Sequence, residues 1–306
     1  MQEQNPIQAV AVIGLGRMGG PMALNLLRAG FTVSGYDLAL QQRIALAEQG
    51  VTVADSIPEA VQDVDAIITM LPNDEAFQIV VEGVNGLLEQ LQTGQIMIAM
   101  GTNKLATTQR VAALVGTRGG QMLDAPVSGG EQGARDGMLS IMVGGSRNTF
   151  TRCLPILETL GATVTYVGGS GMGLIAKLVN QMLMEASFCA IAEAFTMASQ
   201  AGADLDAVYQ AVRSGLGGSR ALDWMLPQIL SGDLGSGREL MLHHKDGAYA
   251  LAAAELLGCW MPITQLTHEL FDQALAAGQG GFSPAAVARV YEEQTGIKLI
   301  KKEEGG

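Results

Sequence analysis

The sequence predicts an α/β domain with a mostly parallel, doubly wound sheet, followed by an all-helical domain that one long helix joins to it. Two observations carry this prediction. From residue 10 to residue 167, short apolar strand patterns alternate with helical patterns, as in parallel sheets whose strands are joined by helices. Beyond the glycine-rich stretch 168–171 the strand patterns end and helical patterns replace them. We therefore expect a first domain over residues 1–167 and a second over residues 168–306.

The first domain begins with a strand, a glycine turn and a helix in direct succession. The apolar residues 10–13 lead into GLGRMG at 14–19, and a helical pattern follows. Because helices separate the successive strands, the strands should run parallel and bring their carboxyl ends to one edge of the sheet. Further strands are expected at 31–36, 51–54, 65–70, 96–100, 122–124, 139–143 and 163–167, with helices at 40–49, from 57 onward and at 149–160.

The glycine turn has the spacing of a dinucleotide-binding site. Gly14 permits the tight turn, Gly16 lets the backbone approach a pyrophosphate, and Gly19 allows the helix to pack closely on the strand. Asp37 ends the second strand, where an acid accepts hydrogen bonds from the adenosine ribose. A carboxylate repels a 2′-phosphate, so NAD is favoured, and the nearby Arg43 leaves NADP possible. The expected cofactor-binding residues of this Rossmann-type domain are Gly14, Leu15, Gly16, Arg17, Met18, Gly19 and Asp37.

Three further loops should line the same crevice, because each follows the carboxyl end of a predicted strand. In the last of them, a serine hydroxyl beside unobstructed glycine N–H groups makes a suitable cradle for a carboxylate. An ordinary glycine turn would explain that loop equally well. The residues concerned are Leu71, Pro72 and Asn73 after the fourth strand, Thr102 after the fifth, and Ser128, Gly129 and Gly130 after the sixth.

One long helix is expected from Leu174 to Gln200, a stretch without proline or glycine. Apolar residues occur on every side of it, so we expect burial all round, with a homodimer or homotetramer supplying part of the cover. Lys177, Asn180 and Gln181 share one face of its first turns through their i, i+3 and i+4 spacing. The positive end of the helix dipole disfavours a cation at Lys177, which indicates a functional reason for this lysine.

The second domain carries helical patterns only. Glycine clusters separate these patterns, and no internal repeat is evident. Helices are expected at 205–212, 222–230, 239–257, 263–277 and 284–293.

Composition and charge exclude several function classes. The 306 residues are 48% hydrophobic and 16% charged, as in a compact globular protein, and the net charge of −12 disfavours binding to nucleic acid or anionic membranes. Three cysteines without CxxC spacing, and an N-terminal segment without a signal-peptide pattern, indicate a cytoplasmic protein. Charged residues interrupt the longest apolar stretch, so no membrane span is expected. The histidines and scattered acids show no metal-ligand spacing, so no metal site is expected.

Four segments together resemble the β-hydroxyacid dehydrogenase family, which includes the 3-hydroxyisobutyrate dehydrogenases. The resemblance covers most of the chain and rests on GLGRMGGPM at 14–22, DAPVSGGEQGARDGMLSIMVGG at 124–145, GMGLIAKLVNQ at 171–181 and HKD at 244–246. Within that family, Glu131, the pair Asn180-Gln181 and the run VYQAVRSGLGGSRALD at 208–223 are most similar to tartronate semialdehyde reductases, also called 2-hydroxy-3-oxopropionate reductases.

The resemblance implies an NAD(P)-dependent oxidoreductase that reduces a short carboxylated aldehyde, tartronate semialdehyde, to glycerate by hydride transfer. It implies that Lys177 is the general acid that protonates the carbonyl oxygen. It also implies that Ser128, Gly129 and Gly130 bind the substrate carboxylate, and that Asn180 and Gln181 orient the substrate and the lysine. Lys245 is implied to contact cofactor and substrate in the closed cleft. The residues implied to flank the nicotinamide and its ribose are Thr102, Leu71, Pro72 and Asn73.

This sequence departs from the family pattern beside the presumed cleft, which leaves the exact substrate open. The departures are Ala99, Met100, Gly101, Asn103 and Lys104, where the family usually shows Asp-x-Ser-Ser/Thr, Gly247 in place of a common leucine, and Met138 in place of a common threonine. The runner-up activity is that of a 3-hydroxyisobutyrate or 4-hydroxybutyrate dehydrogenase. Imine reduction on the same scaffold is disfavoured by Lys177. A non-catalytic dinucleotide-binding module is disfavoured by Lys177 together with the intact serine–glycine loop.

Overall fold

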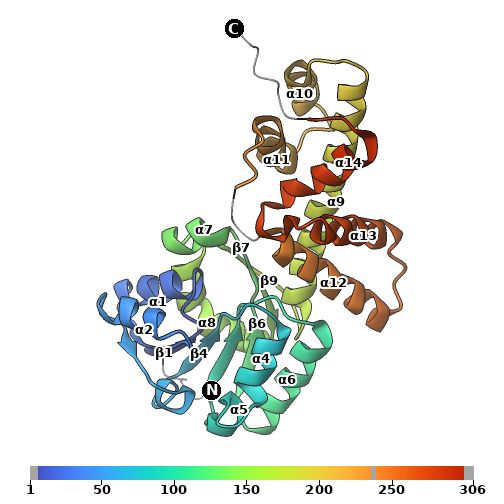
Figure 1. The fold of residues 1–306 in the computed structure, drawn as a ribbon. Coiled ribbons are helices and arrows are strands. Elements are labelled where there is room, and N and C mark those ends of the chain that lie inside the picture. The colour runs from blue at the N-terminus through green and yellow to red at the C-terminus, as the bar shows by residue number, and fades with distance from the viewer. Residues whose placement is uncertain (1–5, 236–238, 300–306) are drawn as a thin grey trace. The chain divides into compact units, whose positions relative to one another are not determined.

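The computed structural model describes residues 6–235 and 239–299 (Figure 1). The chain forms two compact units, Met1–Lys177 and Leu178–Gly306. The sheet lies in the first unit and helices make up the described part of the second. The domain limit between residues 167 and 168 that the sequence suggests stays a prediction.

A nine-stranded sheet forms the centre of the first unit, in the order β3-β2-β1-β4-β5-β6-β8-β7, with β9 paired to β8. The six strands from β3 to β6 in this order are parallel, and this 3-2-1-4-5-6 order is that of the doubly wound dinucleotide-binding fold. The predicted fold class is therefore confirmed. The strands are β1 Ala9–Ile13, β2 Thr32–Tyr36, β3 Thr52–Val53, β4 Ala66–Thr69, β5 Ile96–Ala99, β6 Gln121–Asp124, β7 Val127–Ser128, β8 Ser140–Gly145 and β9 Thr163–Gly168.

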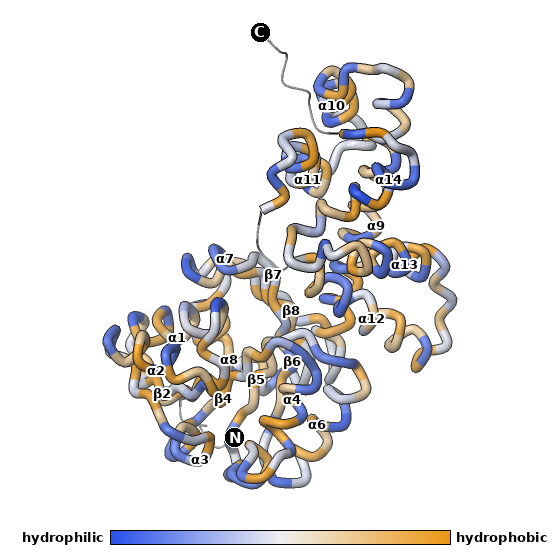
Figure 2. Tube along the Cα trace, viewed as in Figure 1, coloured by the Kyte–Doolittle hydropathy of each residue, from blue (hydrophilic) through white to orange (hydrophobic). Residues whose placement is uncertain are grey.

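Helices cover both faces of this sheet, which explains why its central strands are apolar throughout. Every residue of β4 and β5 is buried, as expected for strands packed on both faces, and the hydrophobic residues of these strands are orange in Figure 2. One apolar core lies under α1 and α8 and the other under α4 and α6 (Figure 1). The helices are α1 Gly19–Arg28, α2 Leu40–Ala47, α3 Ile57–Ala60, α4 Asp74–Glu82, α5 Leu87–Gln90, α6 Leu105–Thr117, α7 Gly130–Asp136 and α8 Arg147–Leu160.

The far edge of the sheet differs from a simple parallel continuation. β8 runs antiparallel to β6 and to β7, and only β9 returns to a parallel pairing with β8. The cause is the short connection after β6, which contains β7 and α7 and has no long crossover helix. The sequence pattern predicts only a glycine-rich loop at β7 and α7, because the two elements are short and α7 is rich in glycine.

The long helix α9 runs from Met172 to Gln200, close to its predicted limits. Its burial in the single chain is partial. Val179, Leu183 and Met197 are 47%, 67% and 71% exposed in the single chain, so one apolar stripe of α9 is uncovered. The single chain therefore covers only part of this helix, and cover of the remaining stripe by another subunit stays a prediction.

By length and composition alone, α9 is apolar enough to cross a membrane. The sequence-based expectation that its charged residues remove it from this class is therefore wrong. Of the residues in its most apolar window, 44% are buried inside the structure. A single such helix is weak evidence for a membrane span, since core helices pass the same test.

The second unit packs its helices around one apolar core. Phe188 and Phe195 of α9 meet Met225 and Leu226 in this core, together with Phe271, and all five are nearly fully buried. Serine and aspartate caps begin its helices, with Asp204 before α10 and Ser219 before α11. The elements are α10 Leu205–Arg213, α11 Arg220–Ser231, α12 Glu239–Leu257, α13 Pro262–Ala276, the 3₁₀ turns η1 Gln279–Gly281 and η2 Pro284–Val287, and α14 Ala288–Thr295 (Figure 1).

Candidate functional site

The glycine turn after β1 has the shape of a phosphate cradle. Gly14 has φ +96°, and a Cβ there would lie 2.4 Å from the Met70 carbonyl oxygen. A Cβ at Gly19 would lie 1.8 Å from the Gly14 carbonyl oxygen. Both positions therefore exclude any larger residue. At Gly16, by contrast, a Cβ would meet nothing within 4 Å among the described residues, so the backbone borders open space where a pyrophosphate fits.

The start of α1 is equally suited to bind phosphate. No side chain in the described part of the chain caps this helix, and its first turn holds no acidic residue. The Gly20 N–H donates to the Gly16 carbonyl oxygen at 2.9 Å, and Pro21 has no N–H. What this helix start offers an anion is therefore mainly the positive end of the helix dipole. The geometry of Gly14, Gly16 and Gly19 with this uncapped helix fits a dinucleotide.

Asp37 supports the glycine turn through the backbone. Its Oδ2 accepts a 2.7 Å hydrogen bond from the Leu15 N–H and its Oδ1 a 2.8 Å bond from the Ala39 N–H. The side chain is half-buried, and each oxygen keeps a second lone pair for another donor. Asp37 thus holds the turn in place as well as carrying the negative charge that disfavours a 2′-phosphate.

Arg43, the one cation near Asp37 in the sequence, is engaged elsewhere. Its Nη1 lies 2.6 Å from Asp55 Oδ1 and donates to the Ala54 carbonyl oxygen at 3.1 Å. A role in binding a 2′-phosphate would require Arg43 to leave this pair.

A charged bridge joins the glycine turn to the serine–glycine loop. Arg17 forms an ion pair with Glu131 of α7, and Arg135 binds the other oxygen of Glu131 at 2.7 Å. Hydrogen bonds from Arg17 and then Arg135 lower the pKa of Glu131, which keeps it ionised. The two sequence segments expected to hold cofactor and substrate are thereby linked directly.

The loops after β4 and β5 are clamped together by a buried acid. Asp74, 3% exposed, accepts a 2.8 Å bond from the Lys104 N–H and a 3.0 Å bond from the Thr107 hydroxyl. A Cβ at Gly101 would lie 2.9 Å from the Leu71 carbonyl oxygen, so the glycine at this altered position lets the two loops pack closely. Asn73 caps α4 through a 2.8 Å bond from Ala76 N–H. The expected residues Leu71, Pro72, Asn73 and Thr102 therefore share one edge of the sheet.

Asn103 adds a polar atom to this edge. Its side chain is 2% exposed, and its Oδ1 has no hydrogen-bond partner among the described residues. A buried acceptor without a protein donor is a natural contact for a bound ligand. The sequence marks Asn103 only as a departure from the family pattern, because burial is not visible in the sequence.

The serine–glycine loop has a backbone that only glycine adopts readily. Gly129 has φ +132° and Gly130 φ +63°, directly after Ser128 ends β7. Without a Cβ, these two residues leave their backbone N–H groups unobstructed by side chains of their own. Ser128 is half-buried, so its hydroxyl remains reachable. The geometry agrees with a carboxylate cradle, and its assignment as a substrate site stays a prediction.

Asp124 fixes the start of α9 to the end of β6. Its Oδ1 accepts from the Gly171 N–H at 2.7 Å and its Oδ2 from the Leu174 N–H at 2.9 Å. Burial raises the pKa of Asp124, and these backbone hydrogen bonds oppose that rise. The sequence offers a signal for this residue, an acid at the carboxyl end of a strand, but sequence reasoning gives it no role.

Lys177 follows Leu174 by one helical turn and belongs to the first unit. It is 8% exposed, which is rare for a lysine and excludes a solvated surface role. A Cβ at Gly173 would lie 2.3 Å from the Met142 carbonyl oxygen and 2.5 Å from that of Asp124. The first turn of α9 therefore touches the sheet backbone, and this contact fixes where Lys177 stands.

The remaining expected residues lie in the second unit. Gln181 donates to Asp246 Oδ2 at 2.7 Å and accepts from Asn180 at 3.0 Å. Lys245 Nζ lies 3.2 Å from Asp246 Oδ1 and forms an ion pair with it, but the angles at this contact do not meet those of a hydrogen bond. The structure thus brings Asn180, Gln181 and Lys245 together around Asp246. Asp246 is part of the HKD motif, but the sequence assigns it no role. That Lys245 completes the site in the first unit stays a prediction.

Comparison with known proteins agrees with this geometry. Residues 9–168 match the family described as the NAD-binding domain of 6-phosphogluconate dehydrogenase, and residues 171–291 match that described as NAD-binding of NADP-dependent 3-hydroxyisobutyrate dehydrogenase.

Individual relatives match over nearly their whole length. The chain is 37% identical to 2-hydroxy-3-oxopropionate reductase of Escherichia coli, covering 94% of this chain and 98% of that protein. It is 35% identical to 3-hydroxyisobutyrate dehydrogenase of Pseudomonas aeruginosa, covering 86% and 90%. Among solved structures, Mycobacterium tuberculosis 3-hydroxyisobutyrate dehydrogenase with L-serine superposes with a TM-score of 0.85 at 30% identity, covering 93% of this chain and 99% of that one.

Proposed function

Because this chain belongs to the β-hydroxyacid dehydrogenase family and is an NAD(P)-dependent oxidoreductase, we propose that it reduces tartronate semialdehyde to glycerate, with Lys177 as the general acid. The observation that carries the proposal is the buried Lys177, fixed one turn beyond the Asp124 anchor on the edge of the sheet that holds the glycine turn.

The residues of the chain divide the work between binding and proton transfer. A bound nicotinamide dinucleotide supplies the hydride. Ser128, Gly129 and Gly130 bind the substrate carboxylate through the serine hydroxyl and the glycine N–H groups. Lys177 holds a proton toward the carbonyl oxygen and gives it up as the alcohol forms, so the product is the hydroxyacid.

The second unit contributes orientation in this proposal. Asn180 and Gln181 follow Lys177 at i+3 and i+4 on α9, so their side chains share its helix face. The 2.7 Å bond from Gln181 to Asp246 holds the amide, and Asp246 in turn pairs with Lys245. We assign Lys245 to contacts with cofactor and substrate.

The choice of substrate rests on the relatives. The Escherichia coli relative that is 37% identical is a 2-hydroxy-3-oxopropionate reductase, and the match covers nearly both chains. The runner-up is oxidation of 3-hydroxyisobutyrate, which the Pseudomonas aeruginosa relative supports, or of 4-hydroxybutyrate. Imine reduction remains disfavoured, because the proton donor Lys177 is present and buried. A non-catalytic dinucleotide-binding module is disfavoured for the same reason.

We also propose that the protein is at least a homodimer, with the exposed apolar stripe of α9 in the contact.

A substrate panel tests the proposed activity. The oxidation of NADH and of NADPH is followed at 340 nm with tartronate semialdehyde, methylmalonate semialdehyde, succinate semialdehyde and a cyclic imine. We expect the highest kcat/KM for tartronate semialdehyde with NADH, and glycerate as the product. A higher kcat/KM for another semialdehyde would move the assignment to the runner-up activity, and turnover of the imine alone would overturn the hydroxyacid assignment.

A further inference from the structure

Two histidines and an aspartate that are distant in the sequence meet between α12 and α13. His244 belongs to α12, while His268 and Asp272 are spaced i, i+4 on α13 and so share one face. One donor atom of each residue lies within 4.8 Å of the other two. The sequence spacing does not indicate this cluster, because its members come from two helices.

The donor atoms of the cluster lie within reach of one small cation. His244 Nε2 lies 2.6 Å from Asp272 Oδ1. The two imidazole rings stack with centroids 4.4 Å apart and planes 20° apart, so one ring must turn for both histidines to direct a nitrogen lone pair at the same ion. In a tetrahedral zinc site, bond lengths of about 2.0–2.2 Å place neighbouring donor atoms about 3.3 Å apart. The 57%-exposed Asp272 side chain can rotate to reach this spacing without moving the helices.

Gly247 makes room for the inner part of the cluster. A Cβ at this position would lie 3.2 Å from His268 Nδ1 and 3.0 Å from Glu185 Oε2. The leucine that commonly follows Lys-Asp in the family would therefore displace both groups. The glycine is thus a departure that opens space for a histidine and a carboxylate next to α12.

His268 is held with an unused polar atom. Its Nδ1 is buried and has no hydrogen-bond partner among the described residues. This nitrogen is therefore available as a ligand atom for a bound ion.

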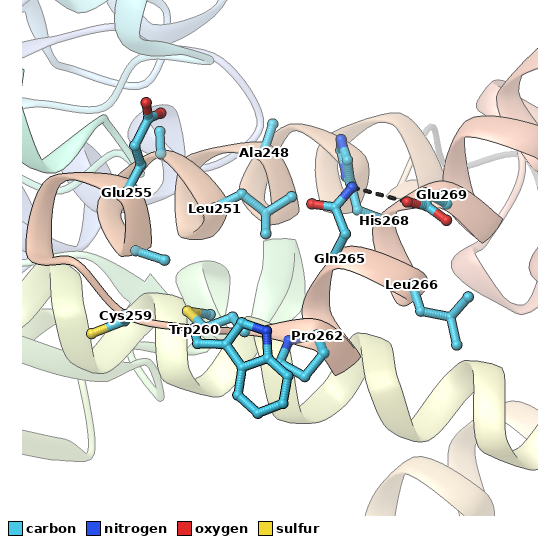
Figure 3. Close-up of a pocket in the computed structure, with 13 residues that line it drawn as sticks. Ala248, Leu251, Glu255, Cys259, Trp260, Pro262, Gln265, Leu266, His268 and Glu269 are labelled. Atoms are coloured by element: carbon cyan, nitrogen blue, oxygen red, sulfur yellow. Dashed lines mark hydrogen bonds between the residues drawn. The ribbon is translucent and has the colours of Figure 1, made fainter.

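Solvent reaches the cluster from two sides. A groove of about 850 Å³ runs along α12 and α13, and His268 contributes to its lining beside Ala248 and Gln265 (Figure 3). The side chains of His244 and Asp272 are 24% and 57% exposed. An ion can therefore enter without unfolding of either helix.

We propose that His244, His268 and Asp272 bind one divalent transition-metal ion of the zinc class, with water completing the coordination. Two imidazoles and one carboxylate favour zinc, nickel or copper over magnesium or calcium, which prefer oxygen ligands. The bound ion ties the first turns of α12 to α13, and His244 directly precedes Lys245. Metal binding therefore fixes the backbone next to Lys245.

Equilibrium dialysis of the full-length, untagged protein against zinc chloride tests the site, after treatment with EDTA. We expect one zinc ion per chain, and cobalt(II) should give visible d–d bands that zinc removes. His268→Ala and Asp272→Ala should each weaken zinc binding at least tenfold. Glu269→Ala, which removes an exposed acid adjacent to His268, and Cys259→Ser, which removes the exposed thiol, should bind as the parent does.

Two outcomes would overturn the proposal. One is the lack of stoichiometric zinc binding by the parent protein. The other is parent-like binding by both His268→Ala and Asp272→Ala. Circular dichroism of each metal-free variant establishes that it is folded, and Asp272→Ala keeps the test decisive if His268→Ala unfolds, because Asp272 is exposed.

Discussion

Buried or half-buried acids position the candidate site mainly through backbone N–H groups. Asp37 holds the glycine turn, Asp74 joins two loops, and Asp124 anchors α9. Each lies at or just beyond the carboxyl end of a strand, where parallel strands leave their loops unpaired. The sequence predicts a ligand role for Asp37 but gives none to Asp74 or Asp124, because a carboxylate that binds backbone has no distinctive residue pattern.

The thiols provide a prediction about burial and ionisation. Burial raises the pKa of Cys153 and of Cys189 to about 12, so at pH 8 only about one in ten thousand of these thiols is ionised. Cys259 is exposed. We expect a thiol reagent at pH 8 to modify one thiol per native chain and three in denaturant, measured by absorbance or mass spectrometry.

Raising the pH to 9 should still leave Cys153 and Cys189 unreactive, because it remains far below their pKa. Cys259→Ser serves as the control and should abolish the fast reaction. Rapid modification of two or more thiols in the native parent protein would contradict the described burial.

At the scale of elements, the start of α9 is defined by contact with the sheet. The backbone near Gly173 approaches that of β6 and β8 too closely for any side chain. Helical periodicity predicts the length of α9, yet it cannot reveal that its first turn is packed against strands. For the same reason the sequence predicts β7 and α7 as a loop, since their identity depends on pairing with β8 and on neighbouring loops.

Replacement of Gly173 tests this contact. Gly173→Ala places a methyl group 2.3–2.7 Å from three backbone atoms, and overpacking of this kind costs about 3 kcal/mol. We expect a fall in Tm of several degrees and a lower kcat, because the shifted helix start moves Lys177. Gly169→Ala is the matched control, since a Cβ there meets nothing within 4 Å among the described residues. Equal Tm values for both variants would refute the packing argument.

At the scale of the whole molecule, the sequence predicts the order of elements well and their exposure less well. The switch from alternating strands and helices to helices alone is visible in the pattern, and so are the helices of the second unit. Exposure of Val179, Leu183 and Met197 depends on which neighbours cover α9, and a linear pattern does not contain that information. Within the candidate site, the sequence identifies Lys177 and the glycine turn, because these residues belong to recognisable motifs.

The exposed stripe leads to a prediction about assembly. Leu183 is 67% exposed in the single chain and belongs to the uncovered apolar stripe with Val179 and Met197, and contiguous exposed apolar surface marks interaction sites. Leu183→Glu should shift the protein toward monomer in analytical ultracentrifugation at micromolar concentration. Val84→Glu alters a 90%-exposed valine outside α9 and should leave the parent assembly intact. A parent protein that sediments as a clean monomer would refute the proposed dimer.

The central claim is that Lys177 donates the proton during hydride transfer, and steady-state kinetics of Lys177→Ala test it most directly. The variant is compared with the parent in kcat for tartronate semialdehyde and in the Kd for NADH, measured by nucleotide fluorescence. Lys104→Ala, which removes an exposed lysine of the altered loop, is the control. We predict a fall in kcat of roughly 10²- to 10⁴-fold for Lys177→Ala, an unchanged Kd for NADH and near-parent turnover for Lys104→Ala. Parent-like turnover by Lys177→Ala would contradict the account.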